Sequence, residues 1–195
     1  MRHLIAIALL LACYTTAQAN NQHYILLTAS TTTVTPFLIS DQAISHRRLL
    51  STTNGKIWLS AMSERLQKVM PNQKERDDFL STVHYEATRA GLDPQLILSI
   101  IQVESGFKKY AISHAGARGY MQIMPFWVET IGNNDHNLFH LRVNLRYGCM
   151  IFRHYLDMEK GNYFRALGRY NGSLGQAKYP QLVFNAWQKR WAYPS

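Results

Sequence analysis

The chain has 195 residues, of which 47% are hydrophobic and 17% charged, and its formal net charge is +9. This length allows one domain with a hydrophobic core and excludes two ordinary domains once N-terminal segments are set aside. The positive charge predicts attraction to polyanions such as nucleic acid, anionic lipid or a carboxylate-bearing cell wall, and it does not choose among them.

Residues 1–19 have the pattern of a signal peptide. Arg2 supplies the positive charge, an apolar run extends from Leu4 to Ala12, and Ala17-Gln18-Ala19 matches a small-residue cleavage site. The run is shorter than the about 20 apolar residues that a transmembrane helix needs. We therefore predict export from the cytoplasm, with a mature chain that begins near Asn20 and has lost one positive charge.

The two cysteines have different expected fates. Leu10 to Cys13 resembles a bacterial lipobox, so a lipid anchor in the outer membrane through Cys13 is the alternative to simple secretion. Both routes lead out of the cytoplasm, to a periplasmic, outer-membrane or secreted location, and both exclude a disulfide within the mature protein. Cys149 stands among apolar residues, which predicts a buried side chain and not a reactive thiol.

Residues 20–57 are rich in serine and threonine and lack sustained helical periodicity, which predicts a linker or weakly ordered lead-in. Helical spacing begins at Trp58. Apolar residues then recur every fourth position up to Pro71 (Met62, Leu66 and Met70). We therefore place one domain at residues 58–195.

The next segments predict two helices with defined ends. A helix over about 73–90 stops at Gly91, and Asp93-Pro94 supplies an N-cap and a first-position proline for the following helix. The run from Leu96 to Val103 is apolar on nearly all sides, so this helix is predicted to form the buried centre of the domain, with Glu104 at its end.

The rest of the chain also favours helices. The stretch from Ser113 to Gly119 breaks the periodicity, and a short helix is expected after Pro125. Residues 141–160 read as a long helix, with shorter helical pieces at 164–170 and 182–191. The alternating pattern of strands is scarce, so the predicted fold class is mainly α.

Glu104 is the first candidate for chemistry. Desolvation by Ile100, Ile101 and Val103 would raise its pKa and keep the carboxyl protonated near neutral pH, the state that protonates a glycosidic oxygen. The alternative for a lone glutamate at a helix end is a side chain that points into water. Neighbouring motifs decide between these interpretations.

Several blocks follow Glu104 in a fixed order. Together they resemble the soluble lytic transglycosylase (SLT) family, which shares a goose-type-lysozyme-like helical fold, over roughly residues 73–191. The blocks are Glu104-Ser105-x-Phe107, Ala111-x-Ser113-x-x-Gly116-Ala117-x-Gly119, Tyr120-Met121-Gln122-Ile123-Met124-Pro125, Asn144-Leu145-Arg146-Tyr147-Gly148 and Tyr170-Asn171-Gly172.

The resemblance implies roles for individual residues. Glu104 would be the catalytic acid and base, and Ser105 would orient it or its sugar. The glycan groove would be lined by the remaining substrate-binding candidates, which are Met121, Gln122, Tyr170 and Asn171. We expect the domain to require no cofactor and no metal.

The sequence departs from the family pattern at two places. Ile151-Phe152 replaces a common Tyr-Leu, and Tyr170-Asn171 is followed by Gly172-Ser173 where Ala-Gly is usual. These differences concern fine substrate contacts and leave the proposed acid intact.

The distribution of carboxylates indicates a mechanism with one catalytic group. Most glycosidases use two carboxylates, but the next acidic residue after Glu104 is Glu129, and later ones stand outside the motifs. The resemblance implies cleavage between N-acetylmuramic acid and N-acetylglucosamine in peptidoglycan, with attack by the muramic acid C6 hydroxyl and formation of anhydromuramic ends.

Two alternatives share this fold. A goose-type-like muramidase would hydrolyse the same bond with water, and a peptidoglycan-binding component of an envelope-spanning secretion or division machine would need no cleavage. Intact Glu104, Ser105 and Gln122 argue against a purely binding role.

Metal and nucleic-acid sites are also weighed. His136 and His140 have i, i+4 spacing, but Asn137 stands where a zinc protease has glutamate, so surface or supporting histidines are expected. From Lys108 onward there are twelve Lys and Arg against four Asp and Glu. No nucleic-acid-binding motif accompanies this charge, so nucleic acid is not an expected partner.

Overall fold

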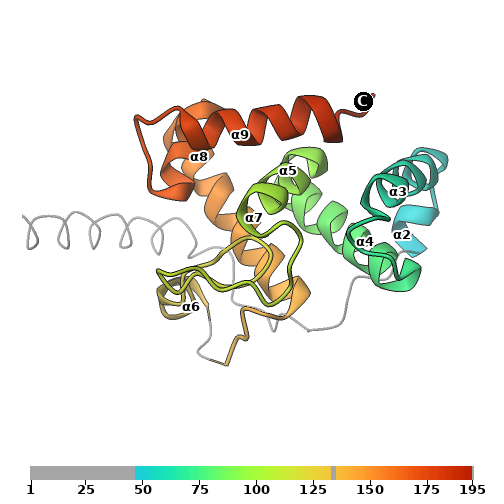
Figure 1. The fold of residues 1–195 in the computed structure, drawn as a ribbon, viewed down its shortest axis with the longest axis horizontal. Coiled ribbons are helices and arrows are strands. Elements are labelled where there is room, and N and C mark those ends of the chain that lie inside the picture. Colours follow the sequence, from blue (N-terminus) through green and yellow to red (C-terminus); the bar gives the residue numbers. More distant parts are fainter. Residues whose placement is uncertain (1–46, 133–134, 195) are drawn as a thin grey trace, which may run out of the picture. The chain divides into compact units, whose positions relative to one another are not determined.

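The computed structural model describes residues 47–132 and 135–194 (Figure 1). The predicted signal peptide, Cys13 and the lead-in up to residue 46 lie outside the described residues. Within the described ranges the chain is helical, and two isolated antiparallel bridges join Arg118 to Ile112 and Ile123. The predicted mainly α class is confirmed. The described chain divides into a larger unit, 47–125 with 135–194, and a smaller one, 126–132.

The larger unit begins with α2 (Arg47–Leu50) and α3 (Thr53–Leu66). Helix α3 starts five residues before Trp58, because the Thr52 side chain caps it by accepting the Gly55 N–H at 3.0 Å. The last part of the Ser/Thr-rich segment is therefore helical. The four apolar residues that the sequence places at every fourth position are all buried, namely Trp58, Met62, Leu66 and Met70.

Helices α4 (Gln73–Arg89) and α5 (Pro94–Ser105) confirm the predicted helices. Gly91 ends the first segment with φ +64°, and the Asp93 carboxylate caps α5 by accepting the Gln95 N–H at 2.6 Å. Helix α5 packs against α4, α9 and η1, and its apolar residues from Leu96 to Ile101 are fully buried. It is the buried central helix that its sequence predicts.

The chain continues with α7 (Leu141–Met158), α8 (Tyr163–Asn171), α9 (Lys178–Ala186) and the π-helix η1 (Trp187–Trp191). Helix α9 starts four residues before the predicted Leu182, since Pro180 is tolerated in the first turn, where amide groups need no helical partner. Helix α7 packs on α4 and α8, and α8 packs on α9 (Figure 1).

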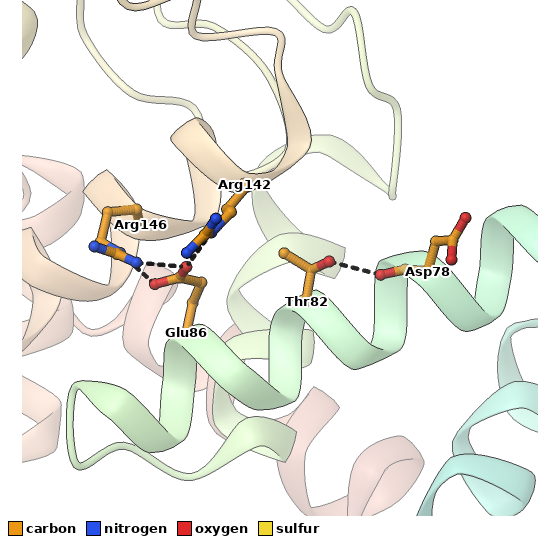
Figure 2. A network of polar contacts seen from close by, with 5 residues as sticks. All are labelled: Asp78, Thr82, Glu86, Arg142 and Arg146. Carbon is orange, nitrogen blue, oxygen red and sulfur yellow. Dashed lines mark hydrogen bonds and ion pairs between the residues drawn. The ribbon is translucent and has the colours of Figure 1, made fainter. Parts of the chain in front are cut away.

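A buried ion-pair network joins α4 to α7 (Figure 2). The Glu86 side chain is wholly inaccessible to solvent and accepts from Arg142 Nε at 3.3 Å and from Arg146 Nη2 at 2.9 Å, with a further bond from Arg146 Nε. One turn earlier, the Thr82 hydroxyl donates to the Asp78 carbonyl. These ion pairs fix the register of α7 on α4. The network also supports the candidate site, because α7 carries much of the framework of that site.

The smaller unit contains α6 (Phe126–Ile131), the short helix expected after Pro125. The Phe126 and Trp127 rings lie 5.1 Å apart, and the Thr130 hydroxyl donates to the Phe126 carbonyl at 2.9 Å. Across both units, none of the described helices combines the length and apolar character that a bilayer crossing requires.

Candidate active site

Glu104 lies in the last turn of α5, where the helix leaves the core. Gly106 ends the helix with φ +57°, and Phe107 follows with φ +67°. Two successive left-handed residues turn the chain sharply away from the helix axis. Phe107 is itself buried against Phe79 and Trp191. The turn is thus anchored in the core directly behind the carboxyl group.

Tyr179 is the direct partner of Glu104. Its hydroxyl donates to Glu104 Oε1 at 2.6 Å, and its ring is buried in the first turn of α9. The bond occupies one carboxyl oxygen and leaves Oε2 to carry a proton. Sequence reasoning missed this residue, because 75 positions separate the partners and no recognised motif includes Tyr179.

Burial controls the ionisation of Glu104. Desolvation raises the pKa of its carboxyl from an ordinary 4.5 to about 7, and the hydrogen bond from Tyr179 acts in the opposite direction. No second carboxylate of the larger unit contributes to this shift. The carboxyl is therefore poised to donate and accept a proton near neutral pH.

Tyr170 stands beside this pair. Its hydroxyl donates to the Met121 carbonyl at 2.8 Å, and its ring meets Phe152 edge-on at 5.9 Å. Burial, together with the nearby charge of Glu104, raises the pKa of Tyr170 well above its usual range. The structure thus places Tyr170 within electrostatic reach of Glu104. Asn171 follows as the exposed last residue of α8.

Ser105 is buried and turned toward the backbone. Its hydroxyl lies 2.8 Å from the Tyr120 carbonyl and 3.2 Å from the Ile101 carbonyl. It therefore ties the end of α5 to the loop over 106–125. This geometry suits the orientation of the neighbouring Glu104 better than direct contact with a sugar.

Met121 does not line a groove, contrary to the expectation from sequence. Its side chain is fully buried and lies over Gly148 of α7, where an added Cβ would stand 2.2 Å from the Met121 sulfur. The glycine in α7 is therefore required by close packing. Met121 serves the site through its carbonyl, which holds Tyr170.

Asn144 holds the loop over 106–125 in place by hydrogen bonds. From a fully buried position on α7, its amide donates to the carbonyls of Arg118 and Leu138 at 2.9 and 2.8 Å, and its oxygen accepts the Met121 N–H at 2.8 Å. Gly119, with φ +77°, leaves the space for this amide, because a Cβ there would lie 2.5 Å from Asn144 Nδ2.

Gln122 closes the same loop. It adopts φ +51°, and its amide donates to the carbonyls of Gly119 at 2.9 Å and Ala111 at 3.2 Å. The side chain is half-buried, so it shapes the loop and keeps part of its surface accessible.

The remaining sequence candidates are explained by packing. His136 Nδ1 lies 2.7 Å from the Tyr147 hydroxyl, and His140 is the residue preceding α7, so the two histidines share no helix face. The described residues contain no group of three metal-ligating side chains. Cys149 is buried, as predicted, and burial raises the pKa of its thiol.

Curated relatives match segments of this chain. A 47-residue segment is 51% identical to membrane-bound lytic murein transglycosylase C of Mannheimia succiniciproducens, and covers 24% of this chain and 13% of that protein. A 79-residue segment is 38% identical to the protein of the same name from Klebsiella pneumoniae, and it covers 40% of this chain and 21% of that protein. The matched segments thus span about a fifth or less of these relatives.

Solved structures with some likeness include the lytic transglycosylase Slt of Pseudomonas aeruginosa, in an inactive mutant form, with 24% identity and a TM-score of 0.45 over 54% of this chain and 20% of that one. The 70 kDa soluble lytic transglycosylase of Escherichia coli has 17% sequence identity and a TM-score of 0.43. That match covers 71% of this chain and 24% of the other. The family model described as the transglycosylase SLT domain matches residues 81–188. Because this match covers more than half of the chain and includes Glu104, the chain belongs to the transglycosylase SLT domain family.

Proposed function

We propose that this chain is a lytic transglycosylase that cleaves the glycan strands of peptidoglycan, with Glu104 as its single general acid and base. The observation that carries the proposal is the state of this carboxyl group. Burial raises its pKa to about 7, and the Tyr179 hydroxyl holds one of its oxygens at 2.6 Å. The choice of peptidoglycan as the substrate rests on the names of the relatives, which are murein transglycosylases.

The reaction proceeds in two proton transfers. Glu104 first gives its proton to the glycosidic oxygen between N-acetylmuramic acid and N-acetylglucosamine, and the bond from that oxygen to the anomeric carbon breaks. The acetamido oxygen of the muramic acid stabilises the positive charge that develops there. The C6 hydroxyl then attacks the anomeric carbon and returns its proton to Glu104, so that no water is consumed. General acid–base assistance contributes about a hundred- to ten-thousand-fold in rate.

A single carboxylate suits this reaction, because the nucleophile belongs to the substrate. In the larger unit, Glu86 and Glu159 are each engaged by two arginines. Asp157 pairs with Arg153. These carboxylates have structural partners, whereas Glu104 is bound by a neutral hydroxyl.

Other site residues have supporting roles in this proposal. Ser105 and Tyr170 position the carboxyl and the loop beneath the glycan. Gln122 and the exposed Asn171 are the candidates for direct hydrogen bonds to sugar groups. Met121 contributes through its backbone alone.

We infer that the protein acts outside the cytoplasm, after removal of residues 1–19 or after lipidation at Cys13. The names of the relatives describe them as membrane-bound, which favours the anchored form. The intact mass of the mature protein tests this: an added lipid at the N-terminus supports anchoring, and a chain that starts near Asn20 supports release. Recruitment by secretion or division machinery remains a prediction.

Digestion of purified peptidoglycan tests the proposed activity. Mature wild-type protein, Glu104→Gln and the control Glu64→Gln, which changes an exposed carboxylate on α3, are each incubated with insoluble sacculi. Mass spectrometry then identifies the released fragments. We expect anhydromuramic ends from wild type and control, and none from Glu104→Gln. Reducing ends would indicate a muramidase, and no release from folded protein would indicate a binding role.

A further inference from the structure

A pocket of the larger unit lies apart from Glu104. It has a volume of about 860 Å³, which is within the range of about 300–1,000 Å³ usual for ligand sites. Its walls come from α3, α4, the first turn of α5 and the C-terminal residues Tyr193 and Pro194. Gln95 lines it, and Glu104 follows nine residues later on the same helix, a separation of about 14 Å at the helical rise. The pocket is therefore distinct from the candidate active site.

Aromatic rings form much of the pocket. The Trp58 indole donates to Gln95 Oε1 at 3.3 Å and meets the His84 ring edge-on at 4.9 Å, which fixes both rings. Tyr85 and Tyr193 add two half-buried rings. Such surfaces pack against the apolar faces of a ligand while their polar edges remain available for hydrogen bonds.

The charge of the pocket favours an anion. Arg89 lines it, and no Asp or Glu does among the described residues. Burial and the neighbouring charge of Arg146 lower the pKa of Arg89, and Glu86 acts in the opposite direction. Glu86 already pairs with Arg142 and Arg146, so positive charge exceeds negative charge at this end of α4.

An unsatisfied hydroxyl also belongs to the pocket lining. Ser81 is 2% exposed, and its Oγ has no hydrogen-bond partner among the described residues. Buried hydroxyl groups without partners are uncommon in folded proteins. A ligand that reaches this wall can supply the missing bond.

We propose that this pocket binds a carboxylate-bearing muramyl unit of peptidoglycan, as a second site for the polymer that Glu104 cuts. The choice of polymer rests on the proposed function. The Arg89 guanidinium would bind the carboxylate, the rings would pack against sugar or peptide, and Ser81 would bond a polar group. The carboxylate can belong to the lactyl group of bare muramic acid or to the attached peptide. Holding one polymer at two places raises its apparent affinity without a change in the catalytic contacts.

The test uses mature Glu104→Gln, so that no ligand is consumed. Titrations with N-acetylmuramic acid and with a disaccharide–tetrapeptide are followed by nuclear magnetic resonance at the Trp58 indole N–H and by calorimetry. Arg89→Gln and Ser81→Ala are introduced into this background. Lys189→Gln, which changes an exposed lysine of η1 outside the pocket, is the matched control for loss of charge.

We expect the Trp58 signal to shift on titration and Arg89→Gln to weaken binding by about tenfold, the effect of losing one charge-assisted bond. Ser81→Ala weakens binding without lowering the melting temperature, which separates a ligand contact from a structural role. Lys189→Gln binds as the parent does. Binding of bare N-acetylmuramic acid identifies the lactyl carboxylate, and binding of the tetrapeptide form alone identifies the peptide.

Equal affinity of Arg89→Gln and its parent would overturn the proposal, as would an equal loss in Lys189→Gln or an unshifted Trp58 signal with both ligands. Failure of the proposed catalysis has a different signature. In that case wild-type protein releases no anhydromuramic ends, while binding to Glu104→Gln still depends on Arg89.

Discussion

Replacing Glu104 by glutamine should stabilise the protein at neutral pH while removing its activity. Glutamine has the shape of the protonated acid and does not ionise. The Glu104 carboxyl has a folded-state pKa of about 7, against an ordinary value of 4.5. A group whose pKa is raised by folding contributes stability that is fully present below the unfolded value and is lost as pH rises through the folded value.

The size of the effect follows from these two values. Between pH 4.5 and about 7, the wild-type protein loses about 3 kcal/mol of unfolding free energy through this group, at 1.36 kcal/mol for each pKa unit. Glu104→Gln keeps this free energy, because glutamine does not ionise. The advantage of the variant over wild type should therefore grow by about this amount from pH 4 to pH 8.

Urea unfolding followed by circular dichroism, repeated across that pH range, measures the difference. Glu159→Gln is the control with the opposite sign, because hydrogen bonds from Arg165 and Arg169 lower the pKa of Glu159. Because the folded-state pKa of Glu159 lies below 4.5, that variant should fall behind wild type as pH rises toward 4.5 and should keep a constant deficit above it. A difference between Glu104→Gln and wild type that stays constant with pH, or shrinks as pH rises, would refute the assignment of a buried, raised-pKa carboxyl at this position.

Three further predictions concern the frame of the site. Tyr179→Phe removes a bond that stabilises ionised Glu104, so the alkaline limb of the pH–activity profile should move upward by about one pH unit; an unmoved limb in fragment-release assays would contradict this. Asn144→Ala leaves the Met121 N–H and the Leu138 carbonyl without this partner, while the Arg118 carbonyl keeps its bond from the Ile123 N–H, and it should lower the unfolding free energy by about 3 kcal/mol, measured by urea unfolding. Glu86→Gln leaves two arginines without their carboxylate and should cost about 3 to 5 kcal/mol by the same measurement, whereas a loss below 1 kcal/mol would show that the network contributes little.

Much of the fold could be predicted from sequence because local patterns control it. The Asp93-Pro94 start and the all-round apolar run define α5, and both appear in the structure as predicted. Helix boundaries are harder to predict where the caps are weak. Helix α9 begins without a side-chain cap, so its start at Lys178 has no local signal.

The site was only partly predictable because its contacts join distant segments. Glu104 could be predicted because the motif blocks that follow it decide against a glutamate that points into water, but Tyr179 lies 75 residues further along the chain and outside those blocks. Met121 was expected in the groove from its place in the motif. The expectation was wrong because motif position does not reveal which way a side chain points. Its burial depends on the space left by Gly148, and only the packed structure shows that contact.

Digestion of peptidoglycan in ¹⁸O-labelled water is the most direct test of the central claim. If Glu104 directs attack by the substrate's own C6 hydroxyl, the fragments end in anhydromuramic acid, are lighter than hydrolytic products by one water, and carry no label. Glu104→Gln should release none of them. Incorporation of ¹⁸O at the new ends would contradict the account and identify the protein as a hydrolase.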